Sequence, residues 1–552
     1  MSYQTAKPIS PESAFSGGFC DNTQNLFLKD QYSPYLRNAR LDWQSTIIRP
    51  WHSLFATLTA WSYPKGIWSY LRSDPTNDVL VVRHNKSWTE KLATITESGT
   101  VTDITTDANI LSDNRMFFQN VADVIYCMNG SDGMGKLSGT TYTVPSTGIA
   151  SFAPSFSVVF GGSHWASWWS TNSNKVYKSV ADNYEDFSST GSDSFTFSEQ
   201  IVWLSANLQA LFYFTKNTIS VTGVGDITDT AWTITYNTRA LNVKEWAVNN
   251  ASIVEVGDWT YFLSSSNAIS KIARGTTVNG FDVIDLSSRK YAGIDVLMST
   301  LDKDQSDSFG VYLPDVWLIK WYARTAWATF NDICIVYDTI KDAFLVDSGK
   351  PFYDSVFFKW YTYAVSMIEP KVYQDEINQD DEDSAIDFEY WTKKFYISDP
   401  TYKKILWESR TLLDMNDLAE PTQEIWIDWK LIDSKTINSL RLIQDYLSDI
   451  DWEILIDTEL ESLTTEFYWK TLVWWLWTDA VWLSPIGMTT TSLTEEDDYV
   501  ENIILRTKWN LNVKWREVQF RFYNSSLAWK VRLKNLSMLA EVLPWLTTSL
   551  TQ

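Results

Sequence analysis

Tryptophan stands in this chain at positions where a β-hairpin normally needs glycine. The segment Ile427-Asp428-Trp429-Lys430 places Asp-Trp between two apolar runs. Asp-Gly is the usual dipeptide there, because both central residues of a two-residue hairpin turn take positive φ. An indole side chain carries a steric penalty in that conformation and glycine does not. The pattern recurs along the chain, which holds 30 tryptophans but only 21 glycines, and it indicates strands joined by tight turns.

Two origins of the tryptophans fit this pattern. We expect many of them to be glycine codons read wrongly, because UGA is read as glycine in some bacterial lineages and as tryptophan in others. Tryptophans in strand-like contexts would then be genuine, namely Trp259, Trp321, Trp391 and Trp426. The alternative is a truly tryptophan-rich protein with a ligand-stacking surface, which substitution of Trp165 or Trp321 would test.

Length and composition are those of a globular protein with two or three domains. The 552 residues exceed one typical core, and 45% apolar with 20% charged residues are ordinary values. No run of about 20 apolar residues predicts a membrane helix, and the N-terminus lacks the pattern of a signal peptide. The cysteines Cys20, Cys127 and Cys334 are far apart. We expect no disulfide framework, buried thiols at Cys127 and Cys334, and folding in a reducing cytoplasm.

The net charge of −23 argues against tight general binding to nucleic acid, which needs clustered lysine and arginine. The charge allows a looser relation to DNA, because an acidic channel wall repels DNA and lets it slide. Solubility alone explains the charge equally well.

Short strand-like runs separated by Gly, Asn, Asp and Ser turns dominate the chain. Hairpins are expected at 206–221, with a turn at Lys216-Asn217, at 259–272, and around Asp338–Asp342. About 300 residues of this texture exceed a single sandwich and favour a β-propeller, with the number of blades left open. We predict an all-β protein, in which a β-propeller is followed by a C-terminal β-sandwich-like domain.

The predicted domain boundaries follow changes in composition. Residues 1–69 are an extended entry segment that joins the propeller, 70–373 the propeller, 374–387 an acidic linker, 388–546 the β-sandwich-like domain and 547–552 a polar tail. The acidic run could supply oxygen ligands to Ca²⁺ but lacks the spacing of a known calcium loop. A solvated linker is the favoured interpretation.

Catalytic motifs are not evident in the sequence. The three histidines, His52, His84 and His164, show no metal-ligand spacing. No nucleophile-elbow or phosphate-loop pattern emerges, even when tryptophan is read as glycine. Sequence alone cannot pair the two carboxylates that glycoside hydrolysis needs. We expect no enzyme activity, no cofactor and no metal site.

Two segments carry a resemblance to a known family. Residues 35–51 read as an N-x-R … R-P-G entry strand, and residues 513–522 as a G-R-x-x-Q-x-R strand with Trp515 at the glycine position. With glycine restored, the chain resembles the packaged-DNA-stabilisation and tail-hub proteins of short-tailed phages, which are head-to-tail connectors or tail-tube nozzles. The motif positions, together with the turn pair, are Arg37, Asn38, Arg40, Arg49, Pro50, Trp51, Trp515, Arg516, Gln519, Arg521, Asp428 and Trp429. We expect Arg49 and Arg516 to anchor strands rather than contact DNA.

This resemblance implies a non-enzymatic virion protein. Copies would form a homo-oligomeric ring, expected to be sixfold, below the portal. The ring would stabilise packaged DNA, pass double-stranded DNA during ejection, and contact the portal, the adaptor and other tail proteins without a membrane. The protein would reside in the phage tail after assembly in the cytoplasm of the host bacterium. The alternatives are a carbohydrate-binding or carbohydrate-active propeller for host-surface recognition, and a cytoplasmic scaffold propeller.

Overall fold

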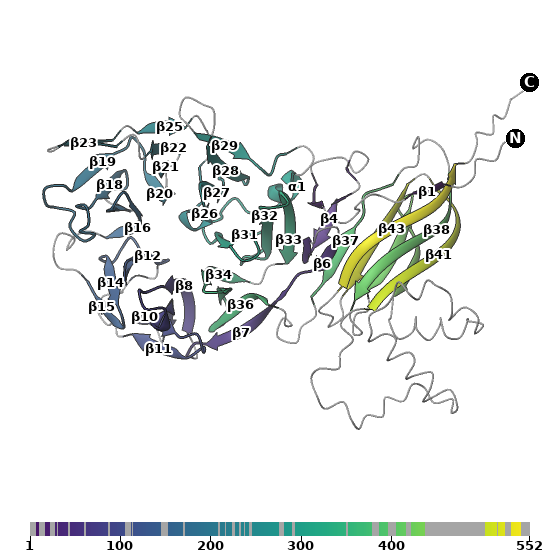
Figure 1. The fold of residues 1–552 in the computed structure, drawn as a ribbon, viewed down its shortest axis with the longest axis horizontal. Coiled ribbons are helices and arrows are strands. Elements are labelled where there is room, and N and C mark those ends of the chain that lie inside the picture. Colours follow the sequence, from purple (N-terminus) through teal and green to yellow (C-terminus); the bar gives the residue numbers. More distant parts are fainter. Residues whose placement is uncertain are drawn as a thin grey trace, which may run out of the picture.

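The computed structural model contains two β-domains side by side, a ring of small sheets and a pair of larger sheets (Figure 1). The structure describes residues 7–9, 17–21, 28–29, 31–41, 45–59, 62–86, 89–104, 112, 114–144, 153–168, 172–207, 210–215, 217–223, 227–230, 233–236, 238–241, 246–274, 281–289, 293–348, 351–377, 386–395, 404–415, 421–436, 503–515, 517–524 and 531–542. Helices are minor in this part of the chain: α1 (Asp295–Ser299) and two 3-10 turns at Pro75–Asn77 and Asn250–Ser252.

The ring of sheets is a β-propeller. Within the described residues, seven sheets each contribute four antiparallel strands to it. The innermost strand of every blade contacts the innermost strands of both neighbouring blades, so the ring is closed. The predicted propeller is therefore confirmed, and its blades, left uncounted from the sequence, number seven.

The blades follow the order of the chain, each from its innermost strand outward. The first three are β8 (Ser62–Tyr70), β9 (Val79–Lys86), β10 (Thr89–Ile95) and β11 (Val101–Ile104); β12 (Phe117–Val121), β13 (Val124–Met128), β14 (Gly135–Ser138) and β15 (Thr141–Thr143); and β16 (Pro154–Phe160), β17 (Ser163–Trp168), β18 (Lys175–Lys178) and β19 (Asp193–Thr196). The next two are β20 (Ile201–Ala206), β21 (Ala210–Thr215), β22 (Ile219–Gly223) and β25 (Arg239–Leu241); and β26 (Ile253–Val256), β27 (Trp259–Leu263), β28 (Ile269–Arg274) and β29 (Phe281–Asp285).

The sixth blade comprises β30 (Phe309–Leu313), β31 (Leu318–Ala323), β32 (Ile333–Asp338) and β33 (Ala343–Ser348), and it is extended outward by β2 (Gly18–Phe19) and β3 (Tyr32–Ser33). The seventh comprises β34 (Phe352–Phe358), β35 (Tyr361–Ser366), β36 (Lys371–Ile377) and β7 (Trp51–Thr57). Between β22 and β25 of the fourth blade, β23 (Ile227–Thr230) and β24 (Thr233–Tyr236) form a separate hairpin. The three hairpins expected from the sequence are confirmed as β21–β22, β27–β28 and β32–β33.

The propeller is closed by a strand from the N-terminal part of the chain. β7 pairs antiparallel with β36, from Lys371 opposite Thr57 to Ile377 opposite Trp51. β7 supplies the fourth, outermost strand of the last blade, so that blade is built from segments at both ends of the propeller sequence. The propeller thus begins at β7 and β8 rather than at residue 70, because its closure uses backbone hydrogen bonds between distant segments that composition does not reveal.

The second domain consists of two packed sheets. One has the order β41 (Ile503–Trp515), β38 (Lys404–Met415), β43 (Val531–Val542), β6 (Thr46–Ile48) and β5 (Ala39–Leu41), with β1 (Lys7–Ile9) paired to β43. The other has the order β4 (Tyr35–Arg37), β37 (Phe388–Trp391), β42 (Val518–Asn524), β39 (Thr422–Ile427) and β40 (Lys430–Thr436). The β-sandwich-like domain after the propeller is confirmed. It also takes β1, β4, β5 and β6 from the predicted entry segment, so the propeller is inserted between its strands.

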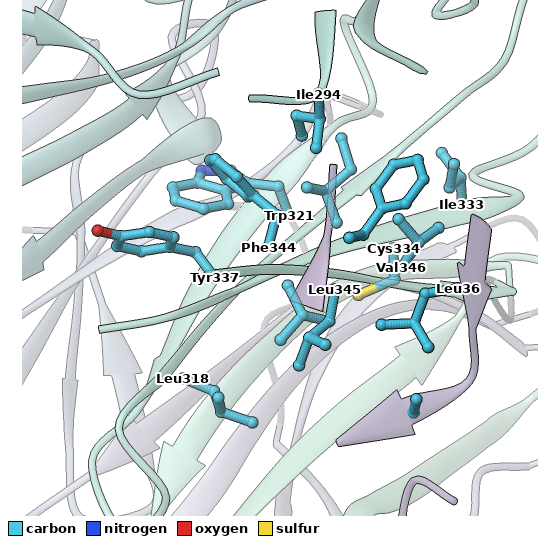
Figure 2. Close-up of a cluster of buried hydrophobic side chains, with 14 of the residues drawn as sticks. Leu36, Ile294, Leu318, Trp321, Ile333, Cys334, Tyr337, Phe344, Leu345 and Val346 are labelled. Atoms are coloured by element: carbon cyan, nitrogen blue, oxygen red, sulfur yellow. The ribbon is translucent and has the colours of Figure 1, made fainter. Parts of the chain in front are cut away.

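The two domains share one hydrophobic core. This core joins Phe520 and Leu533 of the second domain to the apolar side chains of the fifth and sixth blades. Figure 2 shows Leu36 of β4 beside Cys334 and Val346 of the sixth blade. Such a shared core favours a fixed arrangement of the domains over a flexible linkage. Cys334 and Cys127 are both buried and free, as expected.

Candidate functional site

The chain crosses between the two domains beside a buried asparagine. Asn38 has a φ of +54°, a conformation that asparagine tolerates better than most residues. Its Nδ2 donates to the carbonyl of Asp387 at 2.6 Å and to the hydroxyl of Ser348 at 2.8 Å, and its Oδ1 accepts from Nε of Arg49 at 3.3 Å. Arg49 lies on the outward crossing, Asp387 on the return crossing and Ser348 at the end of the sixth blade. One side chain therefore ties all three segments together.

Arg40 joins the second domain to the propeller by ion pairs. Its Nη1 and Nη2 donate to the two carboxylate oxygens of Asp347 on β33, at 2.9 and 2.7 Å. The same guanidinium pairs with Glu376 on β36. Burial raises the pKa of Asp347, but the charge of Arg40 outweighs it and holds that pKa below its usual value. This forked geometry requires arginine, since an ammonium group cannot reproduce two parallel hydrogen bonds.

Lys320 on β31 lies in a second group of charges next to the first. Its ammonium donates to Asp375 at 2.5 Å and lies 2.6 Å from the carboxylate of Glu376. His52 Nδ1 lies 2.5 Å from the other oxygen of Asp375, and its Nε2 lies 3.4 Å from Nη1 of Arg49. Burial lowers the pKa of Lys320, but the neighbouring carboxylates more than reverse this and raise it.

These groups form one buried closure cluster of opposite charges. Three cations face three carboxylates beside His52, namely Arg40, Arg49, Lys320, Asp347, Asp375 and Glu376. Removal of one member of a buried ion pair leaves an uncompensated charge and costs about 3–5 kcal/mol. The cluster therefore has the character of a structural joint, in which each carboxylate is held by a cation, rather than of a reactive centre.

The start of the predicted acidic linker belongs to this cluster, which corrects the prediction of a solvated segment from 374 to 387. β36 extends to Ile377, and Asp375 and Glu376 are buried against cations. Their carboxylates neutralise buried cations of the closure cluster. Glu376 has a φ of +57°, at a point where the pairing of β36 with β7 is irregular. Residues 378–385 lie outside the described part of the chain. No cluster of metal-ligating side chains occurs among the described residues.

The second domain carries a repeated Glu-x-Trp unit on one face of a sheet. In β37 the indole Nε1 of Trp391 donates to Glu389 at 2.7 Å, and in β39 that of Trp426 donates to Glu424 at 2.9 Å. Arg521 lies on β42 between these strands and bridges the two carboxylates, at 2.7 and 3.2 Å. The indole rings lie 5.5 Å apart, inclined by 45°. Burial lowers the pKa of Arg521, but the two glutamates outweigh it and raise that pKa.

Asp428 and Trp429 form the turn between β39 and β40, as the sequence predicts. Their φ angles are +46° and +68°, and Ile427 pairs with Lys430 across the turn. The prediction that both positions need positive φ is confirmed. Trp429 is 76% exposed, with the Lys394 ammonium over its ring. A tryptophan therefore occupies a backbone conformation that favours glycine.

Three exposed tryptophans lie on one face of the propeller. A blade of four antiparallel strands returns the chain to the side where it entered, so the first turns of all blades face the same way. Trp317, with a φ of +58°, and Trp360 lie in first turns, and Trp259 begins the strand after one. Trp259 belongs to the fifth blade, Trp317 to the sixth and Trp360 to the seventh. Trp327, which is 97% exposed, lies in a second turn and hence on the opposite face.

Trp165 and Trp321 are fully buried, which corrects their use as test residues for glycan binding. Their indole Nε1 groups donate to the carbonyls of Phe160 at 3.0 Å and Ser252 at 2.9 Å. A buried indole whose N–H has a protein partner belongs to the core and cannot stack on a ligand. For Trp321 this agrees with its place among the tryptophans expected to be genuine.

The three histidines all lie in buried structural surroundings. His164 is 2.6 Å from the Ser157 hydroxyl and 3.0 Å from the carbonyl of Tyr184. Burial lowers the pKa of His164 to about 4. His84 lies 3.4 Å from Asp103, and His52 belongs to the closure cluster.

The other N-terminal motif positions surround the closure cluster. Arg37 on β4 is the backbone partner of Glu389. The carbonyl of Pro50 accepts from Arg49 at 3.0 Å, and Trp51 begins β7 opposite Ile377. Arg49 is buried, in agreement with an anchoring role.

The C-terminal motif positions lie elsewhere, in the second domain. Trp515 ends β41 opposite Lys404. Gln519 Nε2 donates to the carbonyl of Thr392 at 2.7 Å. Arg516 lies outside the described residues. The motif residues therefore separate into two places, the closure cluster and the sheet of Arg521.

Sequence reasoning missed the propeller side of the closure cluster. Asp347, Asp375, Lys320 and His52 come from four blade strands and have no common motif. A signal existed only at Lys320, a charged residue inside the run Leu318-Ile319-Lys320-Trp321. A lysine in a fully buried strand needs a carboxylate partner, but the sequence does not say which one.

Comparison with known proteins adds a distant structural likeness. No family model matches this chain, and no curated protein matches it. Among solved structures, YCF48 from Cyanidioschyzon merolae is similar with a TM-score of 0.35 and 12% sequence identity, over 58% of this chain and 98% of that one. Among the described residues, no helix is both long and apolar enough to span a membrane.

Proposed function

We propose that the protein is a structural component of a phage tail and has no enzymatic role. Copies form a ring, sixfold by the resemblance, below the portal. The ring retains packaged DNA, forms part of the ejection channel, and contacts the portal, adaptor and neighbouring tail proteins in the virion. The resemblance of residues 35–51 and 513–522 to tail-hub proteins motivates this proposal.

The observation that carries the proposal is the closure cluster. The N-x-R … R-P segment places Asn38, Arg40 and Arg49 in a buried joint between the propeller and the second domain. A channel wall under load needs domains that keep a fixed relation, and four chain crossings, a shared core and paired charges supply this. The buried position of Arg49 supports the anchoring role that we expect for this residue.

Propeller charges limit where DNA could pass. The seven innermost strands contain only Lys65, Glu255 and Asp354 as charged residues. Glu255 and Asp354 accept hydrogen bonds from neighbouring strands. An acidic wall would therefore be formed by the outer surfaces of several copies around a common axis, where the net charge of −23 lets DNA slide.

We further propose that turn tryptophans such as Trp317 and Trp429 are glycine in the natural protein, through UGA codons. Their positive φ angles support this. Trp321 and Trp165 are genuine core residues under the same proposal. The coding DNA gives the direct test: UGA at 317 and 429 with UGG at 165 and 321 is expected, and UGG at all four positions overturns it.

The ring is tested with virions of the phage that carries the gene. Mass spectrometry of purified virions should detect the protein at a fixed copy number, and cryo-electron microscopy should show a ring of propellers below the portal. Absence from virions, with the protein present in infected cells, would overturn the tail assignment.

The row of Trp259, Trp317 and Trp360 on one propeller face favours a second candidate, a carbohydrate-binding surface for host recognition. It requires all three positions to be tryptophan in the natural protein. Trp317→Ala and Trp360→Ala should then abolish binding to host-surface glycan on an array, with Trp327→Ala on the opposite face as the matched control. Equal glycan binding by all three variants would exclude this surface.

A further inference from the structure

Two cations lie over a pair of tyrosine rings where the fifth and sixth blades meet. Tyr261 on β27 and Tyr337 on β32 are buried, with ring centroids 5.9 Å apart. The Lys271 ammonium lies 5.2 Å from the centroid of the Tyr261 ring, and the central guanidinium carbon of Arg289 lies 6.0 Å from that of Tyr337. Figure 2 shows the Tyr337 hydroxyl turned away from the apolar side chains beside it. The interblade site consists of these four residues with Trp259 and Asp342.

The charge of Arg289 is already compensated within the interblade site. Its Nη1 lies 2.5 Å from a carboxylate oxygen of Asp342, and the Tyr337 hydroxyl donates to the other oxygen. Burial raises the pKa of Asp342, but the hydrogen bonds from Arg289 and Tyr337 outweigh it and lower that pKa. The Asp342 side chain is nevertheless largely exposed, so this carboxylate is fixed in place and still able to accept a hydrogen bond from a ligand.

The Lys271 ammonium differs from that of Arg289 because no carboxylate compensates it. Among the residues that the structure describes, no acidic side chain forms an ion pair with it, and its contacts are the rings of Trp259, at 3.7 Å, and Tyr261. Burial lowers the pKa of Lys271, which means that its charge is incompletely solvated and would gain from an anionic partner. The interblade site therefore has one uncompensated positive charge in a chain whose net charge is −23.

Trp259 supplies an apolar surface next to this free cation. The Lys271 ammonium covers one face of its indole, and 43% of the residue remains exposed. Trp259 begins β27 and is not among the residues with positive φ, so the site does not depend on how turn codons are read. A fixed indole with free surface beside an unpaired ammonium suits a ligand that has an apolar ring face and an anionic group on the same ring.

We infer that the interblade site binds an acidic sugar, a uronic or sialic acid unit of a glycan. The Lys271 ammonium donates to the sugar carboxylate, Trp259 stacks on the sugar ring, and Asp342 accepts from a sugar hydroxyl. One uncompensated cation fits one carboxylate, whereas a phosphate polymer needs clustered lysine and arginine. This inference rests on the second candidate function, the carbohydrate-binding face, and names the class of sugar that this face takes.

Calorimetric titration of the full-length protein with matched oligosaccharides tests the inference. The probes are oligomers of galacturonic acid, of glucuronic acid alternating with N-acetylglucosamine, and of sialic acid, each paired with its carboxyl-reduced counterpart. At least one acidic oligomer should bind about tenfold or more tightly than its reduced form, because only the acidic form offers a charged partner to Lys271. This preference should shrink as salt is added, since the ammonium is only partly buried. Equal binding of both forms of every probe would overturn the inference.

Substitutions separate the roles of the cation and the indole. Lys271→Met removes the ammonium at nearly constant length and should abolish the preference for the acidic form. Trp259→Ala should weaken the acidic and reduced forms alike, and Trp259→Phe should restore part of both. Lys371→Met is the matched control, because Lys371 also lies over a tyrosine ring, that of Tyr373, but is paired with Glu369 at 3.2 Å. This control should bind like the unmodified protein.

The outcomes distinguish this inference from the function on which it rests. Glycan binding without a preference for the acidic form, or a preference that survives Lys271→Met, refutes the acidic-sugar site and leaves the carbohydrate-binding face standing. Absence of glycan binding by the unmodified protein refutes both, and the tail assignment is tested separately in virions. Thermal unfolding shows whether each variant keeps its fold. If Lys271→Met does not fold, the comparison of acidic and reduced probes on the unmodified protein still decides.

Discussion

Arg40 and Asp347 form two parallel hydrogen bonds of 2.9 and 2.7 Å across 307 positions of the sequence. Arg40 lies on a strand of the second domain and Asp347 on the outer strand of the sixth blade. The pair connects the two domains at the point where the chain passes from one to the other. Both side chains are buried, with exposed fractions of 7% and 6%. Salt in the solvent therefore screens the attraction between them only weakly.

Asp347→Asn should lower the free energy of unfolding by about 3–5 kcal/mol, because it leaves buried Arg40 with Glu376 alone, a carboxylate that Lys320 also shares. Denaturant unfolding followed by near-UV circular dichroism measures the change. Glu97→Gln, which breaks the pair with Lys359 at the surface, is the control and should cost no more than about 1 kcal/mol. A similar small loss for both variants would show that the closure cluster does not hold the domains.

Trp429→Gly should stabilise the protein by about 1 kcal/mol, because glycine has no Cβ penalty at a φ of +68°. Trp317→Gly, at +58°, should act in the same direction. Both are measured as the midpoint of thermal unfolding. Trp321→Gly is the opposite control, since it removes a buried side chain and should destabilise strongly. Destabilisation by Trp429→Gly would mean that the indole at this turn contributes packing that outweighs its backbone strain.

His164 should make stability fall in mild acid. Its pKa is about 4 in the folded protein against 6.5 as the ordinary value, so the unfolded chain binds the proton first. Stability from this group is complete above pH 6.5 and is lost as the pH falls towards 4, by roughly 3 kcal/mol in all. His164→Gln should flatten the slope of the unfolding free energy between pH 6.5 and 4. An unchanged slope in this variant would assign the acid sensitivity to other groups.

Trp165 and Trp360 should respond oppositely to the same truncation. Trp165→Ala empties a core site and should cost about 3–5 kcal/mol. Trp360→Ala removes a side chain that is 75% exposed in a turn and should change stability by less than about 0.5 kcal/mol. Thermal or denaturant unfolding of the two variants checks this. Comparable losses would contradict the division of the tryptophans into core and turn residues.

Local patterns predicted the propeller and its hairpins because turn chemistry and strand periodicity act over a few residues. The turn at Asp428–Trp429 is the clearest case: the sequence required positive φ at both positions, and both have it. The same local reasoning placed Trp321 in a strand but could not distinguish a buried indole from an exposed one. That distinction depends on neighbouring segments, such as the turn Asn250–Ser252 just before β26, whose Ser252 carbonyl accepts from the indole.

The sequence by itself determined an all-β chain of short strands, the second β-domain, and motif positions at Asn38, Arg40 and Arg49. Only the tertiary structure decided that β7 closes the seventh blade and that Asp375 and Glu376 neutralise Lys320 and Arg40. The physical reason is the range of the interactions. Turns and alternation act between near neighbours, whereas ring closure and buried charge pairing join segments hundreds of residues apart, and their partners are set by the fold as a whole.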